Sequence, residues 1–175
     1  MSNTADLGCG ALPRLEIGVD IDKDLRKLWL ERFPGRPFIF ADIRFLPFKD
    51  ESLDELISVH SIEHFSHREV PSILKEWCRV LKRGAKLTIS CPNIVQICKN
   101  MVFHGDDNGK EGYEVCFRLY GGQDSPYNFH KSGFNFGYLA TLLREAGFLH
   151  VERKTVKEIG PFYDPDNLVA EAWKG

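Results

Sequence analysis

The sequence predicts an α/β fold in which a doubly wound, mostly parallel sheet ends in a reversed, antiparallel strand. Short apolar runs alternate with stretches of helical periodicity from residue 4 to residue 91. Glycines or carboxylates directly follow the first three of these runs, where ligands bind in such folds. The last two apolar runs have no room for a helix between them, so we expect them to pair antiparallel.

The elements of the first half follow from local signals. Asp22 is a helix N-cap, and Leu25, Leu28, Trp29 and Phe33 follow at helical spacing. Strands are expected over residues 4–7, 15–21, 37–41 and 53–59, the helix after Asp22 ending at Pro34-Gly35.

The second half begins with a strongly signalled helix. Ser66 and Glu69 form a capping-box pattern, an apolar stripe runs from Val70 to Leu81, and Gly84 is expected to close the helix. A strand over 85–91 follows. Residues 94–132 lack clear periodicity and are interpreted as a substrate-side insertion in a single domain, 1–175. A helix over 134–145, ended by Gly147, then precedes strands 149–156 and 168–173, which are joined by a turn region with Gly160, Pro161 and Pro165.

Composition excludes several classes of protein. The net charge is −2 and no basic face is visible, so no nucleic-acid partner is expected. No apolar run approaches the roughly 18 residues of a membrane helix, and no secretory signal is visible. The five cysteines lack Cys-x-x-Cys spacing, so we predict neither a zinc site nor a disulfide framework, and a cytoplasmic location. The oligomeric state stays open, because apolar residues between 94 and 117 would suit either the domain's own sheet or a second copy.

The glycine turn and the next strand tip indicate a cofactor that contains a nucleoside. Gly8 and Gly10 let a ligand approach the backbone closely just past the first strand. Asp20 ends the second strand, where a carboxylate can accept two hydrogen bonds from a ribose diol.

Six motifs in order resemble the class I S-adenosylmethionine-dependent methyltransferases, of the type-11 kind. They are Asp6-Leu-Gly-Cys-Gly10, Gly18-Val-Asp-Ile-Asp22, Ala41-Asp-Ile-Arg-Phe-Leu-Pro-Phe48, Leu53-Asp-Glu-Leu-Ile57, Ile62-Glu-His-Phe65 and Trp77-Cys-Arg-Val-Leu-Lys-Arg-Gly84. The resemblance implies a Rossmann-like fold, methyltransferase activity and S-adenosyl-L-methionine as the cofactor.

The resemblance also implies residue roles. The turn Gly8-Cys9-Gly10 would lie against the methionine part of the cofactor, with Asp6 behind it. Asp20, followed by Ile21, would hold the ribose hydroxyls. Asp42 would accept from the adenine amino group, with the Ile43 backbone beside the ring, and His60 would present its backbone to the cofactor's amino-acid end. Turn or helix capping is the alternative explanation for Asp20 and Asp42.

One departure from the family pattern concerns the first crossover. Leu12 stands where the third glycine is usual, and only residues 11–16 separate the glycine turn from the second strand. A parallel crossover ordinarily needs a dozen or more residues. We therefore expect the first helix to be lost or reduced to a turn, and the cofactor pocket to be open and weak on that side.

The segment from Tyr120 to Phe134 resembles one that lies over the cofactor mouth in part of this family. It implies substrate contacts from Tyr120 and Lys131, with His130 as a catalytic base and His64 as a second catalytic candidate. Helix or loop capping is the alternative for both histidines. No metal ligand is assigned.

The preferred function is methyl transfer from S-adenosylmethionine to a small-molecule or glycan-type acceptor. The alternative is a non-catalytic cofactor- or partner-binding module with the same fold. A nicotinamide dehydrogenase is disfavoured, because Asp20 comes about ten residues after the glycine turn rather than about twenty.

Overall fold

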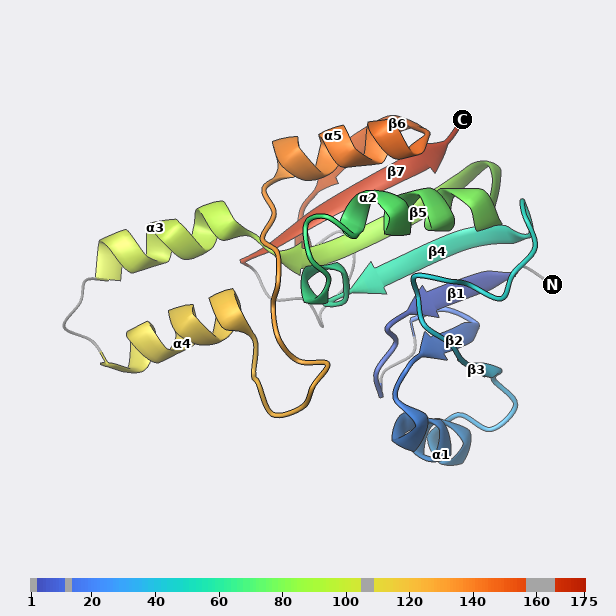
Figure 1. Ribbon diagram of the computed structural model, residues 1–175, viewed down its shortest axis with the longest axis horizontal. Coiled ribbons are helices and arrows are strands. Elements are labelled where there is room, and N and C mark those ends of the chain that lie inside the picture. Colours follow the sequence, from blue (N-terminus) through green and yellow to red (C-terminus); the bar gives the residue numbers. More distant parts are fainter. Residues whose placement is uncertain (1–2, 12–13, 105–108, 157–165) are drawn as a thin grey trace.

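The computed structural model describes residues 3–11, 14–104, 109–156 and 166–175. Within these ranges seven strands form one sheet in the order β3-β2-β1-β4-β5-β7-β6 (Figure 1). All neighbouring strands run parallel except that β7 is antiparallel to both β5 and β6. The predicted α/β fold with a reversed C-terminal strand is therefore confirmed. The strands are β1 (Thr4–Leu7), β2 (Ile17–Asp20), β3 (Phe38–Phe40), β4 (Leu53–Val59), β5 (Leu81–Pro92), β6 (Phe148–Lys154) and β7 (Asn167–Lys174).

Helices α2 (Val70–Val80) and α5 (Phe136–Ala146) pack against each other on one face of the sheet (Figure 1). Trp77 of α2 and Leu143 of α5 are fully buried in this core, together with Leu56, Leu87 and Ala170 from the inner strands. Alternate residues of these strands face the helices, which accounts for their apolar period. The remaining helices are α1 (Lys23–Arg32), the 3₁₀ turn η1 (Ile62–His64), α3 (Ile94–His104) and α4 (Gly109–Tyr120).

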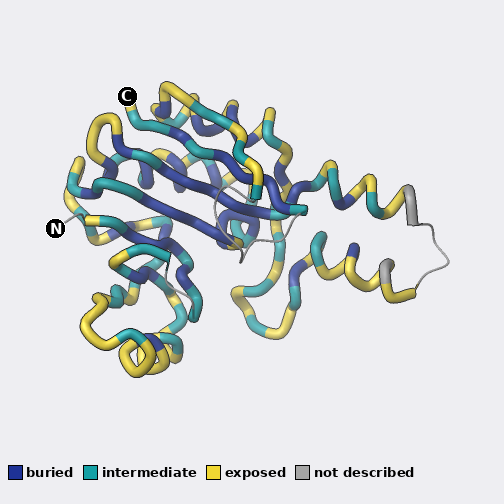
Figure 2. Tube along the Cα trace, turned by 180° about the vertical axis from the view of Figure 1, so that it is seen from behind, coloured by how far each residue is buried: buried dark blue, intermediate teal, exposed yellow. Residues whose placement is uncertain are grey.

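The opposite face of the sheet carries charged side chains. Lys86 of β5 pairs with Glu55 of β4 at 3.2 Å and with Glu171 of β7 at 3.0 Å. Lys154 of β6 pairs with Glu152 at 2.8 Å and reaches Glu171 at 3.8 Å. Seen from behind (Figure 2), the strands of this face lie in front, with α2 and α5 beyond them. On the described part of this face, ion pairs thus connect four strands.

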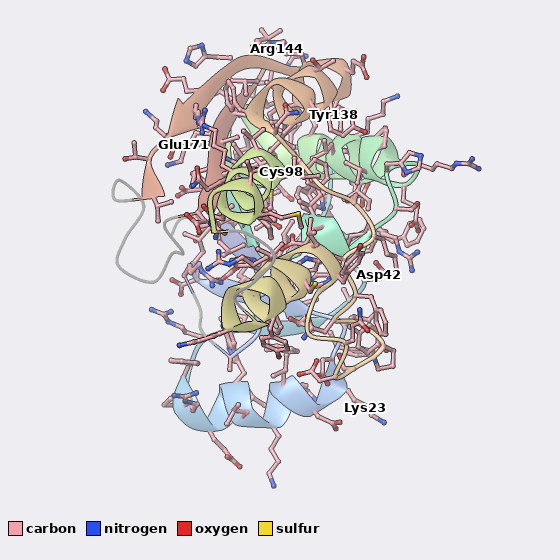
Figure 3. All side chains as sticks on the ribbon, turned by 90° about the vertical axis from the view of Figure 1, so that its left-hand side faces the viewer. Lys23, Asp42, Cys98, Tyr138, Arg144 and Glu171 are labelled. Carbon is pink, nitrogen blue, oxygen red and sulfur yellow. The ribbon has the colours of Figure 1, made fainter. Side chains whose placement is uncertain are left out.

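Helices α3 and α4 form a pair that projects from the sheet (Figure 1). Seen end-on (Figure 3), α3 lies above α4, with α1 below both. Their apolar side chains do not cover the sheet: Val102 is 79% exposed, and Tyr113 is also exposed. Among the described residues no helix combines the length and the apolar character that crossing a bilayer requires.

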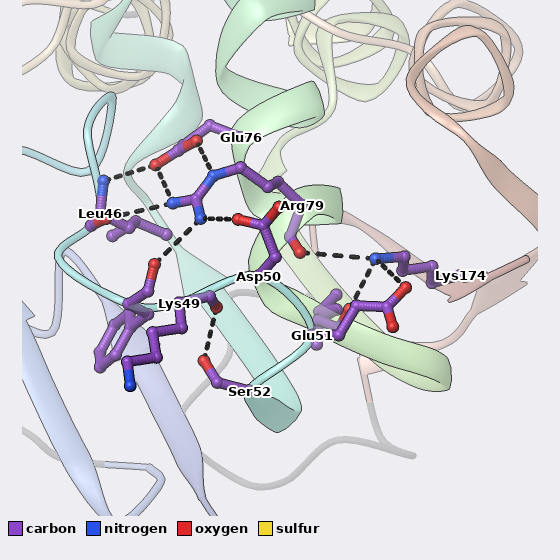
Figure 4. A network of polar contacts seen from close by, with 10 residues as sticks. Leu46, Lys49, Asp50, Glu51, Ser52, Glu76, Arg79 and Lys174 are labelled. Atoms are coloured by element: carbon purple, nitrogen blue, oxygen red, sulfur yellow. Dashed lines mark hydrogen bonds and ion pairs between the residues drawn. The ribbon is translucent and has the colours of Figure 1, made fainter.

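Helix α2 fixes the loop that follows β3. Arg79 donates to the carbonyls of Leu46 and Phe48 and pairs with Glu76 and Asp50 (Figure 4). Glu76 accepts from the Leu46 amide at 2.8 Å. The second half of the loop is therefore tied to α2.

Of two expectations about helices, one is wrong and the other agrees with the structure. The prediction that Gly84 ends α2 is wrong, because α2 ends at Val80 and the chain enters β5 directly. Gly84 lies instead in the stretch of β5 where the pairing register with β4 shifts, at φ +73°. The expected loss of the first helix agrees with the structure, in which residues 8–11 and 14–16 contain no helix. Leu12 and the turn residues Gly160, Pro161 and Pro165 lie outside the described ranges.

Candidate functional site

The carboxyl ends of β2, β1 and β4 meet at one edge of the sheet and line a cavity of about 580 Å³, called here the cofactor cavity. The segment 125–128 and Lys131 form its opposite wall. Of the residues that the sequence assigned, those that line this cavity are Gly8, Gly10, Asp20, Ile21, Asp42, Ile43, His60, His64 and Lys131. The ends of the parallel strands β1 to β4, η1 and the segment after α4 bring these residues together.

The two glycines of the turn are needed for different structural reasons. Gly8 adopts φ +64°, and a Cβ there would lie 2.2 Å from Oγ of Ser61, which follows β4. Gly10 adopts φ +53° with nothing within 4 Å of such a Cβ. Its N–H donates to Asp20 Oδ2 at 3.0 Å. Glycine is therefore required at position 8 because Ser61 approaches closely, and at position 10 only because of the backbone conformation.

Asp20 is held in place by backbone donors. Its Oδ2 accepts from Gly10, and its Oδ1 accepts from the Asp22 N–H at 3.0 Å. Each carboxylate oxygen keeps a second lone pair for a further donor. The geometry is that of an oriented acceptor at the cavity wall.

Asp42 is engaged by a neighbouring cation. Arg44 donates from Nε and Nη2 to the Asp42 carboxylate, at 3.0 and 2.7 Å, and from Nη1 to Glu69 at 2.9 Å. Burial raises the pKa of Asp42, but the hydrogen bonds from Arg44 outweigh it and hold the pKa below its usual value.

Asp6 lies behind the glycine turn and is fully buried. Its Oδ2 accepts from the Arg14 N–H at 2.9 Å and pairs with Arg14 Nη1 at 3.3 Å, while Oδ1 has no partner among the described atoms. Burial raises the pKa of Asp6 to about 6, against the opposing effect of Arg14. Asp6 does not line the cofactor cavity.

A second cavity of about 410 Å³, called here the acceptor cavity, adjoins the first. The two share His60, His64 and Asn128. The other lining residues come from the end of β5, from α4, from the segment after it and from β7: they are Pro92, Glu114, Phe117, Arg118, Gly122, His130 and Asn167. Three shared residues therefore separate a site at the strand ends from a second site beyond β4.

His60 sits between Glu63 and Asn167 in a chain of hydrogen bonds. Its Nδ1 lies 3.1 Å from Glu63 Oε1, and its Nε2 lies 2.9 Å from Asn167 Nδ2. Asn167 Nδ2 also reaches Ser90 Oγ at 3.3 Å. Because an amide nitrogen only donates, His60 Nε2 accepts and Nδ1–H donates to Glu63.

The rings of His64 and His130 meet edge to face, with their centroids 5.0 Å apart. Lys131 and Ser132 donate their backbone N–H groups to the Glu63 carbonyl, at 2.7 and 3.2 Å. These bonds bring a segment that follows α4 beside η1. Burial lowers the pKa of His130, which favours the neutral imidazole.

Three assigned residues lie away from both cavities. Tyr120 is exposed at the end of α4, Asp6 is buried behind the turn, and Cys9 is buried, with burial raising the pKa of its thiol. The sequence analysis missed Asn167, Arg118 and Glu63. Glu63 stood within the motif Ile62-Glu-His-Phe65, but no sequence signal joins Asn167 or Arg118 to the site.

A family model described as a methyltransferase domain matches residues 5–89. Among curated proteins, the chain is similar to a Mycobacterium tuberculosis protein described as a probable S-adenosylmethionine-dependent methyltransferase. The two are 26% identical over 156 residues, which is 83% of this chain and 48% of that protein. The chain spans 38% to 48% of the length of the curated relatives it matches.

Solved structures share the fold. One is a SAM-dependent methyltransferase of Thermotoga maritima, described as a possible histamine N-methyltransferase, with a TM-score of 0.65 and 20% identity over 100% of this chain and 83% of that one. Another is a SAM-dependent methyltransferase of Archaeoglobus fulgidus, with a TM-score of 0.68 and 18% identity over 99% of this chain and 86% of that one.

Proposed function

We propose that the chain is a class I S-adenosylmethionine-dependent methyltransferase and that it transfers the cofactor's methyl group to a molecule bound in the acceptor cavity; the match of residues 5–89 to a methyltransferase-domain model and the similar relatives support this. The observation that carries this proposal is the shared wall of the two cavities, formed by His60, His64 and Asn128. A methyl group leaving one cavity at this wall enters the other directly.

The cofactor's parts follow the strand order. Asp20 accepts from the ribose hydroxyls, and the loop Asp42–Ile43 borders the adenine. The glycine turn and the His60 backbone border the methionine end. Lys131 and residues 125–128 cover the cofactor from the other side.

The chemistry requires little from the protein besides position. The sulfonium already activates the methyl group, so in-line displacement depends on holding the acceptor nucleophile behind it and on excluding water. Burial lowers the pKa of His130 and so favours the neutral imidazole, which lines the acceptor cavity and accepts a proton from a hydroxyl or amine nucleophile.

The acceptor is a small molecule or the end of a glycan. A volume of about 410 Å³ falls in the range of small-molecule pockets, and histidine, asparagine, arginine and glutamate side chains in a partly apolar lining can orient the acceptor. Release of S-adenosylhomocysteine in the presence of small hydroxyl, amine and glycan acceptors tests this class directly.

Calorimetric titration with S-adenosylmethionine and S-adenosylhomocysteine tests the cofactor site. Asp20→Ala is expected to weaken binding by about 1 kcal/mol or more, roughly fivefold or greater, because it removes a charged acceptor. Because the first crossover is short, the wild-type protein is expected to bind more weakly than 1 µM.

Glu31→Ala, on the exposed surface of α1, is the matched control and should leave the affinity unchanged. Failure of the wild-type protein to bind at about 1 mM cofactor would refute the proposal. Cofactor binding without methyl transfer to any acceptor would instead support a non-catalytic binding module.

A further inference from the structure

A carboxylate and two imidazoles converge where the cofactor and acceptor cavities join. One potential ligand atom from each of Glu63, His64 and His130 lies within 4.8 Å of the other two. Glu63 and His64 are neighbours in η1, and the hydrogen bonds from Lys131 and Ser132 to the Glu63 carbonyl bring His130 beside them. The three side chains therefore come together through the backbone of the fold.

Glu63 has an oxygen without a partner. The side chain is 1% exposed, and its Oε1 accepts from His60 Nδ1 at 3.1 Å. Oε2 is buried and meets no hydrogen-bond donor among the described residues. A buried carboxylate oxygen without a donor costs free energy, and a cation at this position would remove that cost.

Both histidines are oriented in the way that metal ligands usually are. His64 Nδ1 lies 3.2 Å from the Phe129 carbonyl oxygen, and His130 Nδ1 lies 2.9 Å from that of Arg118. Because a carbonyl oxygen only accepts, both Nδ1 atoms carry the proton and both Nε2 atoms keep a lone pair. A ligating histidine characteristically donates its other N–H to a carbonyl or carboxylate, which fixes the tautomer. His60, itself held by Asn167, fixes Glu63 in the same manner.

We propose that Glu63, His64 and His130 form a binding site for a divalent transition-metal ion. Imidazole ligands favour ions such as Zn²⁺, Fe²⁺ and Ni²⁺, whereas Mg²⁺, Ca²⁺ and Mn²⁺ prefer sites made of oxygens. In a tetrahedral site with bonds of about 2.0 to 2.1 Å, ligand atoms lie about 3.4 Å apart. Side-chain rotations that move the ligand atoms by about 1 Å reach this spacing.

Three protein ligands leave a coordination position open to the acceptor cavity, which His64 and His130 both line. The role of the ion there rests on the proposed function. With its Nε2 on the ion, His130 would no longer take up the proton of the acceptor; an acceptor hydroxyl bound to the ion would have a lowered pKa and would lose its proton to solvent instead. Its oxygen electron pair forms the new O–CH₃ bond, and the methyl–sulfur bond breaks with its pair on sulfur, giving neutral S-adenosylhomocysteine. The site thus favours oxygen acceptors. In the same cavity, Arg118 pairs with Asp166 at 3.5 Å.

Metal binding is tested without cofactor or acceptor, so the result is independent of methyl transfer. The chelator-treated protein is titrated with Co²⁺, followed by its visible absorption, and with Zn²⁺ by calorimetry. One equivalent is expected to bind. Glu63→Gln, His64→Ala and His130→Ala are each expected to weaken binding at least tenfold. His67→Ala, at an exposed position three residues after His64, is the matched control and should bind as the wild type does.

Lack of Co²⁺ and Zn²⁺ binding at about 1 mM, or unchanged affinity in any of the three variants, would overturn the site. Circular dichroism and denaturant midpoints establish that each variant is folded. If Glu63→Gln is unfolded, the two histidine variants decide. Retained binding of S-adenosylmethionine alongside failed metal binding would refute this inference and leave the proposed function standing; the reverse result would refute only the proposed function.

Discussion

Two glycines of one turn differ in what a side chain would meet. Ala at position 8 would place its Cβ 2.2 Å from Ser61 Oγ and 2.9 Å from Ser61 Cβ, at a positive φ. Ala at position 10 would face open space at a similar φ. Gly10→Ala is therefore expected to cost about 1 kcal/mol of unfolding free energy, and Gly8→Ala about 2 to 4 kcal/mol. Urea unfolding measures both losses of unfolding free energy, provided that the dependence on urea concentration has the same slope in each variant.

A double variant separates the steric effect from the backbone effect. Ser61→Gly in the Gly8→Ala background removes both clashing atoms and should recover the difference between the two single variants. Equal costs for Gly8→Ala and Gly10→Ala would show that the approach of Ser61 does not determine the choice of glycine.

Asp6 makes stability depend on pH in an unusual direction. Its pKa is about 6 in the folded protein and 3.8 in an ordinary aspartate, so the folded state holds the proton more tightly. Asp6 therefore destabilises the protein progressively as pH rises from about 4 to 7, by up to about 3 kcal/mol. Asp6→Asn removes this dependence. The unfolding free energy of Asp6→Asn minus that of the wild type should therefore increase as the pH rises from about 4 to 7.

The cation beside Asp6 provides a second variant. Arg14 lowers the pKa of Asp6, so Arg14→Met is expected to shift the pH-dependent change to higher pH. A constant difference in unfolding free energy between the wild type and Asp6→Asn from pH 4 to 7 would contradict the raised pKa.

At the scale of elements, the attachment of the loop after β3 to α2 depends on Arg79. Arg79→Met removes bonds to two carbonyls and two carboxylates, and is expected to destabilise the fold by about 1 to 3 kcal/mol. Arg83→Met is the matched control: that side chain is 80% exposed with one pair at 3.5 Å, so a change under about 0.5 kcal/mol is expected. Chemical denaturation measures both, and equal effects would refute the role of Arg79.

The elements that sequence patterns predict best are those buried on the sheet. β4 spans residues 53–59 as expected, and α5 ends at Gly147 with φ +111°. The pair α3–α4 escaped prediction because its helices pack mainly on each other, so exposed residues such as Met101 and Phe117 blur the apolar stripe. The interpretation of 94–132 as a substrate-side insertion stays a prediction.

The candidate site divides in the same way. The residues at the strand tips were predictable, because parallel strands bring their ends to one edge. The approach of His130 to Glu63 was not, because it depends on backbone hydrogen bonds between residues 68 positions apart. Asn167 likewise reaches His60 only because β7 pairs with β5. In Figure 3, Asp42 and Glu171 lie on opposite sides of the molecule, which separates the cofactor edge from the charged face.

At the scale of the whole molecule, the strand order constrains how the chain reaches its native state. β6 precedes β7 in the sequence but lies outside it, so β7 must enter between β5 and β6. Until then β5 presents an unpaired edge, which is where chains add to one another during misfolding. The pairing of β5 with β7 joins residues some 75 to 87 positions apart, a long-range contact of the kind that slows folding. The sheet is therefore completed late in folding. How well β5 is protected against self-association depends on how quickly β7 pairs with it.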